Sequence, residues 1–166
     1  MPTDFHPKLK EIADMGHESK QEKLTLLQVE DYRCSVNFGG GILPLTTDEP
    51  APLGSGQGPS PVQLLLAAVA NCLTDSLLFA LRKYKQDAEP LSCEAIANIG
   101  RNDDNRLRVL SIDATMTLGK NSAGIENIER ILEQFEGFCT VTRSVAQGIP
   151  VRLTVRNVTG EVIKHP

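Results

Sequence analysis

The residues of this sequence best suited to chemistry are its four cysteines, Cys34, Cys72, Cys93 and Cys139. A zinc site is not predicted, because no two of them form a C-x-x-C pair and no histidine neighbours them. A histidine base for a serine or cysteine nucleophile is not expected, since all three histidines lie near the termini. The sequence also contains no G-x-S-x-G, H-E-x-x-H or Walker motif. Thiol chemistry remains, with no metal and no cofactor.

The four cysteines differ in their expected surroundings. Cys34 and Cys93 lie among alternating apolar residues of expected strands, which is typical of small buried side chains. Cys72 lies in the middle of an apolar helix, and this position alone also indicates a core residue. Cys139 lies at the expected start of a short helix, where free backbone N–H groups and the nearby Arg143 stabilise a thiolate. Local electrostatics therefore favour Cys139 as the nucleophile.

Composition narrows the class of protein. The 166 residues are 40% hydrophobic and 23% charged, with a net charge of −4, which is typical of one globular domain. Negative charge and few aromatic residues argue against a nucleic-acid partner. The longest uninterrupted apolar run, Leu64 to Ala70, is far shorter than the ~20 residues of a membrane span, so no membrane partner is expected. The N-terminal residues resemble no secretory signal, so we expect a cytoplasmic protein with reduced thiols.

The elements that position these cysteines begin after a charged N-terminal arm, residues 1–23; residues 24–166 are expected to form a single domain. Alternation over Leu24–Phe38 predicts a half-buried strand with Cys34 pointing inward, and Ile42–Thr46 is a candidate second strand. Residues 48–59 form a loop rich in proline and glycine.

A long helix is the clearest local signal. Ser60 is a capping residue, Pro61 occupies the first helical position, and Gln63 follows the cap by three residues. These features predict a helix from Pro61 to about Lys85. Its residues are apolar on every side, so we expect its first four turns to be buried.

The rest of the chain predicts a mixed architecture. A β-hairpin is expected from Leu91 to Leu118, with a turn at Asn102–Asn105. An amphipathic helix of about three turns follows from Ile125 to Phe135. A shorter helix over residues 138–148 and a closing strand over residues 150–155 complete the order, which is that of an α+β fold.

Two segments resemble the hallmarks of the OsmC/Ohr family, the osmotically inducible and organic hydroperoxide resistance proteins. The stretch Gly58–Cys72, GPSPVQLLLAAVANC, is similar to the proline-started helix that carries the first redox cysteine of that family. The stretch Cys139–Thr142, followed by Pro150 and Val151, resembles the second hallmark, C-x-V-S and a closing strand. The order of strands and helices also fits.

This resemblance implies a fold and a reaction. The fold is an intertwined α+β homodimer in which the two cysteines lie close together near the interface. Cys72 is then the peroxidatic thiol, which a hydroperoxide oxidises to a sulfenic acid, and Cys139 condenses with it to a disulfide. An external dithiol of lipoyl or thioredoxin type reduces the disulfide. The apolar surroundings of Cys72 favour organic hydroperoxides as substrates.

The sequence departs from the family pattern at an activating pair. Well-studied members hold an arginine from the early strands over the thiolate with a glutamate at the start of the long helix. The glutamate's position is Val62 here, and the segment around the glycine run at residues 39–41 contains no arginine. Arg33 is the nearest candidate for the arginine.

Three functions are therefore weighed. The first is a cysteine-based hydroperoxide reductase that uses Cys72, Cys139 and Arg33. The second is a dithiol redox partner or sensor without efficient peroxidase activity. The third is a non-enzymatic module that binds a small hydrophobic ligand beside Cys72, with loop 48–59 as a lid.

Overall fold

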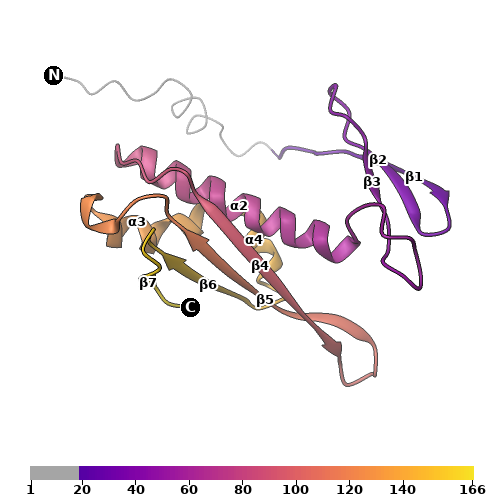
Figure 1. Ribbon diagram of the computed structural model, residues 1–166. Coiled ribbons are helices and arrows are strands. Elements are labelled where there is room, and N and C mark those ends of the chain that lie inside the picture. The colour runs from indigo at the N-terminus through magenta and orange to yellow at the C-terminus, as the bar shows by residue number, and fades with distance from the viewer. Residues whose placement is uncertain (1–18) are drawn as a thin grey trace.

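The computed structural model describes residues 19–166, so the predicted arm, residues 1–23, lies almost entirely outside the described residues. Figure 1 shows a body of helices on one sheet, with a smaller sheet set apart near the first residues of the long helix. The elements are β1 (Thr25–Glu30), β2 (Arg33–Asn37), β3 (Leu45–Thr47), α2 (Pro61–Lys83), β4 (Ser92–Arg101), β5 (Leu107–Thr117), η1 (Ser122–Gly124), α3 (Ile128–Gln134), η2 (Phe135–Phe138), α4 (Thr140–Val145), β6 (Val151–Arg156) and β7 (Val162–Lys164). The mixed content confirms the predicted α+β class.

The smaller sheet contains β1, β2 and β3 in antiparallel order. The prediction of one strand over Leu24–Phe38 is wrong, because a turn at Asp31 and Tyr32 divides it into two strands. The sequence hides this turn: Tyr32 continues the apolar alternation, and Asp31 takes a left-handed backbone, φ 47°, without a glycine. Cys34 lies half-buried in the central strand of this sheet.

The larger sheet has the order β4-β5-β6-β7. The predicted hairpin of β4 and β5 is confirmed, and its turn is closed by a hydrogen bond from the Asn105 N–H to the Asn102 carbonyl. The closing strand β6 runs parallel to β5, and the short β7, which the sequence did not predict, pairs antiparallel with β6. The inner face of the larger sheet is apolar. On its outer face, Asp113 and Arg152 form an ion pair.

The long helix α2 begins at Pro61 as predicted. The Ser60 hydroxyl accepts a hydrogen bond from the Gln63 N–H at 3.3 Å, and the Gln63 side-chain oxygen accepts one from the Ser60 N–H at 2.9 Å. This capping box satisfies donors that a helix start otherwise leaves unpaired. The helix ends at Lys83, two residues before the predicted end.

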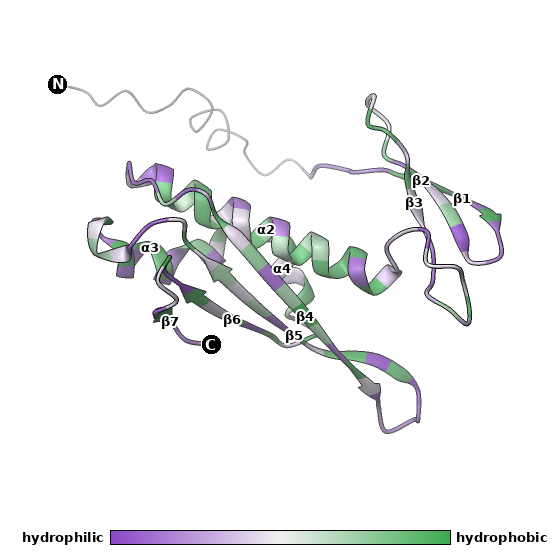
Figure 2. Ribbon diagram, viewed as in Figure 1, coloured by the Kyte–Doolittle hydropathy of each residue, from purple (hydrophilic) through white to green (hydrophobic). Residues whose placement is uncertain are grey.

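Burial of α2 differs from the prediction. Its buried residues begin at Val69, and all of them lie in the part that packs on the larger sheet and the shorter helices. The first two turns, by contrast, contain exposed residues such as Ala67 and Ala68. The expected burial of the first four turns is therefore wrong for the single chain. The other elements of the chain cover only one side of the first turns of α2. Figure 2 shows hydrophobic residues along much of the helix.

By length and composition, α2 is also the one helix among residues 19–166 that could cross a membrane. The core helix of a soluble protein satisfies the same criterion, and α2 packs against β4 and β5. That the protein has no membrane partner stays a prediction, since it rests on the short uninterrupted apolar run.

The segment after the hairpin positions Cys139. The predicted helix Ile125 to Phe135 is shorter in the structure: its regular part is α3, Ile128–Gln134, and Phe135 is the first residue of η2. Asn127 has a left-handed backbone, φ 59°, so the regular helix begins only at Ile128. The single turn of η2 then leads into Cys139, which is the N-cap residue of α4.

A Ser60→Ala variant is expected to lose about 1 kcal/mol of unfolding free energy, because an N-cap hydroxyl accepts a hydrogen bond from the first turn. Urea unfolding of the two proteins measures the difference. Ser60→Asp, which keeps an acceptor at the same place, should retain wild-type stability. An equal loss in both variants would contradict the capping role.

Candidate functional site

The structure brings Cys72 and Cys139 together, although 67 positions separate them in the sequence. Cys72 lies in α2 and Cys139 at the start of α4, and these two helices pack against each other. The backbone N–H of Val141 donates a hydrogen bond to the Cys72 sulfur at 3.4 Å. Cys72 is half-buried, whereas only 1% of Cys139 is exposed. The pair therefore consists of one accessible sulfur and one enclosed sulfur.

The start of α4 does not activate Cys139 as the sequence predicted. Burial raises the pKa of the Cys139 thiol, and the neighbouring Cys72 raises it further. Hydrogen bonds with Thr142 and Ser76 act in the opposite direction and lower that pKa, yet the shift remains upward. The expectation that local electrostatics favour Cys139 as the nucleophile is therefore wrong. The physical reason is that desolvation, which disfavours the Cys139 thiolate, outweighs the stabilisation that the start of α4 offers. The Val141 amide of that helix start donates to Cys72 instead.

The hydroxyl of Thr142 is the nearest polar partner of Cys139: the thiol donates to its Oγ1 at 2.9 Å. A Thr142→Val variant is expected to raise the pKa of Cys139 still further, because the hydroxyl that stabilises its thiolate is lost. At a given pH below the pKa of Cys139, the variant then has a smaller thiolate fraction than wild type, so alkylation of Cys139 slows severalfold. The pH profile of iodoacetamide labelling, followed on the Cys139 peptide, measures the shift. Thr140→Val, at an exposed neighbouring position, should leave the profile unchanged.

An apolar cavity of about 330 Å³ opens beside Cys72. Its lining residues are Cys72, Asp75, Ser76, Phe79 and Phe138. The rings of Phe79 and Phe138 meet edge to face with centroids 5.2 Å apart and form an aromatic part of the cavity wall. A small organic group therefore has room next to the accessible sulfur.

Some of the residues that line the cavity beside Cys72 could be predicted from the sequence, and others could not. Asp75, Ser76 and Phe79 follow Cys72 by three, four and seven residues, the spacing of one helix face. Phe138, which closes the cavity, comes from η2 and had no local signal, because its contact with Phe79 depends on tertiary packing.

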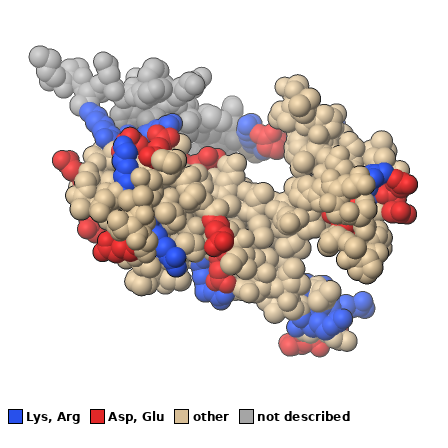
Figure 3. Space-filling model, in the orientation of Figure 1, with Lys and Arg blue, Asp and Glu red and all other residues tan. Residues whose placement is uncertain are grey.

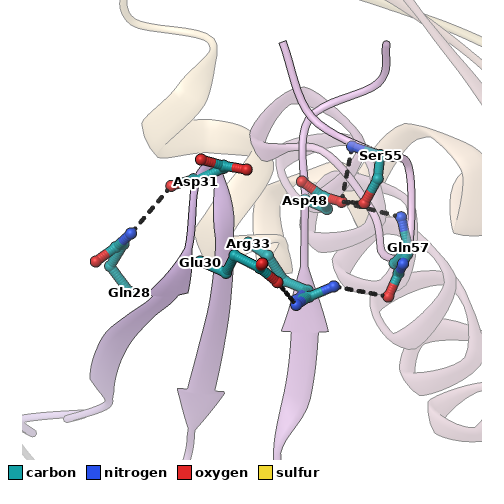
Figure 4. A network of polar contacts seen from close by, with 7 residues as sticks. All are labelled: Gln28, Glu30, Asp31, Arg33, Asp48, Ser55 and Gln57. Carbon is teal, nitrogen blue, oxygen red and sulfur yellow. Dashed lines mark hydrogen bonds and ion pairs between the residues drawn. The ribbon is translucent and has the colours of Figure 1, made fainter. Parts of the chain in front are cut away.

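The third predicted site residue, Arg33, lies in the smaller sheet and contacts neither cysteine within the chain. Figure 4 shows its guanidinium between two side chains: it pairs with the Glu30 carboxylate and donates a hydrogen bond to the Gln57 oxygen at 2.9 Å. The Arg33 side chain is about one-quarter exposed, at 26%. A role for Arg33 in thiol chemistry stays a prediction.

Asp48 organises the loop that holds Gln57. Its carboxylate accepts hydrogen bonds from the Ser55 hydroxyl at 2.7 Å, the Ser55 N–H at 3.1 Å and the Gln57 N–H at 3.2 Å (Figure 4). The Ser55 hydroxyl is the main reason that the pKa of Asp48 lies below its ordinary value. The loop 48–59 is therefore held in a defined shape at neutral pH.

A larger cavity, of about 780 Å³, lies between this loop, the start of α2 and the far end of β4. Val62, which the family resemblance placed at the position of the glutamate, lines it together with Leu66, Ala97 and Ile99. Figure 3 shows the surface hollowed between the two parts of the molecule, over residues that are mostly uncharged. This apolar cavity does not include either cysteine of the pair.

The other two cysteines remain outside the site. Burial raises the pKa of Cys93 to about 11, and its side chain packs against the hydrophobic core. Cys34 is half-buried in the smaller sheet. Within residues 19–166, no group of three or more His, Cys, Asp or Glu side chains could hold a metal ion. The absence of a cofactor stays a prediction.

Fold and site together define a class: an α+β protein that carries a helix-borne cysteine in contact with a second cysteine at the start of a short helix. Comparison with known proteins gives the family. The model of the OsmC-like protein family matches residues 54–154, more than half of the chain. The chain therefore belongs to the OsmC-like protein family.

Solved structures show the same fold. An OsmC-like protein from Mycoplasma pneumoniae superposes with a TM-score of 0.70 at 16% identity, covering 85% of this chain and 99% of its own. An organic hydroperoxide resistance protein from Elizabethkingia anophelis gives 0.68 at 18% identity, with coverages of 85% and 99%. The organic hydroperoxide resistance protein OhrB of Bacillus subtilis gives 0.64 at 16% identity, with coverages of 82% and 98%. No curated protein matches the chain in sequence.

Proposed function

We propose that this protein is a cysteine-based reductase of organic hydroperoxides that acts in oxidative stress defence in the cytoplasm. The observation that carries the proposal is the contact between an accessible Cys72 and a buried Cys139. Structural neighbours that are named organic hydroperoxide resistance proteins support the same reading at the level of the fold.

The reaction follows from the two positions. The Cys72 thiolate attacks the outer oxygen of the hydroperoxide, the O–O bond breaks, and the alkoxide leaves as an alcohol after taking a proton. Cys72 is thereby oxidised to a sulfenic acid. The Cys139 sulfur then attacks the Cys72 sulfur, and water leaves as the disulfide forms. An external dithiol reduces that disulfide and is itself oxidised.

The cavity beside Cys72 supports an organic substrate. Its aromatic wall of Phe79 and Phe138 removes an alkyl or aryl group from water, whereas hydrogen peroxide gains nothing from this contact. Organic hydroperoxides should therefore react faster than hydrogen peroxide.

We further propose a homodimer as the working assembly. The smaller sheet exposes large apolar side chains on both of its faces: Leu26 and Leu27, consecutive in β1, are 57% and 69% exposed. A sheet of three short strands whose apolar side chains pack against nothing in its own chain is expected to need a partner. The start of α2 and the 780 Å³ cavity are also open and apolar, so a second copy of the chain offers a matching surface. Light scattering after size-exclusion chromatography measures the mass.

In such a dimer Arg33 is the residue that the smaller sheet would carry toward the cysteine pair of the second subunit. Glu30 and Gln57 hold its guanidinium in a fixed orientation. In the family pattern, the glutamate at the start of the long helix has this role. An Arg33→Met variant is then expected to slow the first oxidation step while preserving the mass of the dimer.

The test of the proposed function is a count of free thiols after reduced protein is mixed with one equivalent of cumene hydroperoxide, beside hydrogen peroxide. The expected result is that wild type rapidly loses two thiols per chain with cumene hydroperoxide. The Cys72→Ser variant should lose no thiols under the same conditions. Cys93→Ser, a matched change outside the site, should behave as wild type.

One observation favours a second candidate, a dithiol redox partner or sensor with poor peroxidase activity. Val62 occupies the glutamate position and cannot orient a guanidinium, and Arg33 is paired elsewhere within its own chain. Thiols that survive cumene hydroperoxide for minutes but form a Cys72–Cys139 disulfide with an oxidised dithiol would support this candidate.

A further inference from the structure

We propose that Asp75 makes the site select hydroperoxides by charge, favouring neutral molecules over those that carry a carboxylate near the reacting oxygen. The inference rests on the proposed function for its physiological meaning. It names a specificity-determining residue, not a group that takes part in bond making.

The placement of Asp75 carries the argument. It follows Cys72 by three residues in α2, and side chains at this spacing are neighbours on a helix, with Cβ atoms about 5–6 Å apart. Both residues line the same 330 Å³ cavity. A molecule that reaches the sulfur through this cavity therefore passes the Asp75 carboxylate.

Within residues 19–166, no cation is paired with that carboxylate. The other residues of the cavity wall, Ser76, Phe79 and Phe138, are uncharged. Asp75 forms no ion pair or side-chain hydrogen bond with any part of residues 19–166. The ammonium of Lys83 lies 5.3 Å over the ring of Phe138. The backbone of Lys83 is eight positions after that of Asp75, about 12 Å along the helix at 1.5 Å per residue, and Lys83 forms no ion pair with Asp75.

An uncompensated carboxylate has opposite effects on two classes of substrate. A neutral alkyl or aryl hydroperoxide gains from the apolar wall and has no charge to be repelled. A hydroperoxide with a carboxylate close to its O–O group must bring that second anion next to Asp75, and like charges at this separation repel. The site then accepts uncharged organic hydroperoxides and disfavours small hydroperoxy acids.

Two alkylating reagents test this without any peroxide. Iodoacetamide is neutral and iodoacetate is anionic, and with both the Cys72 thiolate forms a sulfur–carbon bond while iodide leaves. The ratio of their rates at Cys72, followed by mass spectrometry of its peptide, is compared between wild type and Asp75→Asn. Any change in the ionisation of Cys72 alters both rates equally and cancels in this ratio.

The expected result is that Asp75→Asn lowers the iodoacetamide-to-iodoacetate ratio at Cys72 by about threefold to tenfold, the effect of one charge in a partly hydrated site. Asp75→Glu should keep the wild-type ratio. The ratio at Cys93, measured in the same samples, is an internal control and should not change, because Cys93 packs against the core and does not line the cavity of Cys72 and Asp75.

A ratio at Cys72 that is the same in Asp75→Asn and wild type would overturn the inference. This outcome is distinct from failure of the proposed function, because alkylation requires no peroxidase activity. If the thiol count with cumene hydroperoxide fails while the alkylation ratio responds to Asp75, charge selection stands and the peroxidase reading alone is lost.

Discussion

In the presence of an external dithiol, a Cys139→Ser variant is expected to consume one equivalent of cumene hydroperoxide per chain and then to turn over far more slowly than wild type. The first step needs only the accessible Cys72, whereas disulfide formation needs the second sulfur held in contact with it. A thiol positioned in this way acts at an effective concentration far above that of millimolar reductant in solution. We therefore expect steady-state turnover with an external dithiol to fall by about 100-fold or more.

The stalled species identifies the step. Dimedone reacts with sulfenic acids, so the Cys72 peptide of Cys139→Ser should gain one dimedone group after peroxide is added, and the wild-type peptide should gain little. Cys93→Ser removes a thiol outside the site and should preserve full turnover. Wild-type turnover in Cys139→Ser would mean that Cys139 is not the resolving thiol.

Replacement of Phe135 by alanine is expected to destabilise the fold by about 3–5 kcal/mol, the usual cost of removing a buried aromatic ring. Phe135 is fully buried, at 0% exposure, and lies in η2 where this turn packs against α2. Such a loss is a large part of the stability of an ordinary domain, about 5–15 kcal/mol. Urea unfolding followed by circular dichroism measures it.

Phe138→Ala provides the matched control, because it removes the same ring from the same turn at a position that is 43% exposed. The ring of Phe138 is partly in contact with water, so its loss should cost clearly less stability. It should instead slow the reaction with cumene hydroperoxide, since the cavity beside Cys72 loses part of its wall. Equal destabilisation by the two variants would contradict this assignment of the core.

The sequence predicted helices and turns well where a few consecutive residues determine the local structure. The capping box at Ser60 and Gln63 is contained in four residues, and the hairpin turn at Asn102–Asn105 is contained in another four. The turn at Asp31 was missed because an aspartate can adopt a left-handed backbone without any change in the apolar alternation around it.

The site was harder to predict than the fold, because its key contact joins α2 and α4. Local sequence alone predicted an activated Cys139 and an inert Cys72, since helix starts stabilise thiolates and apolar helix interiors do not. In the folded chain Cys139 is the enclosed sulfur, and the amide of Val141 points at Cys72. Only the resemblance to a known family assigned the two roles in this order.

The hydrogen bond from Val141 to Cys72 also links the oxidation state of the sulfur to the backbone. A helix of six residues such as α4 has little stability of its own and depends on its tertiary contacts. When Cys72 is oxidised, the acceptor of this amide changes, and the local unfolding free energy of α4 changes with it. Amide hydrogen exchange at Val141 thus becomes a reporter of the redox state of the protein, one that needs no added label.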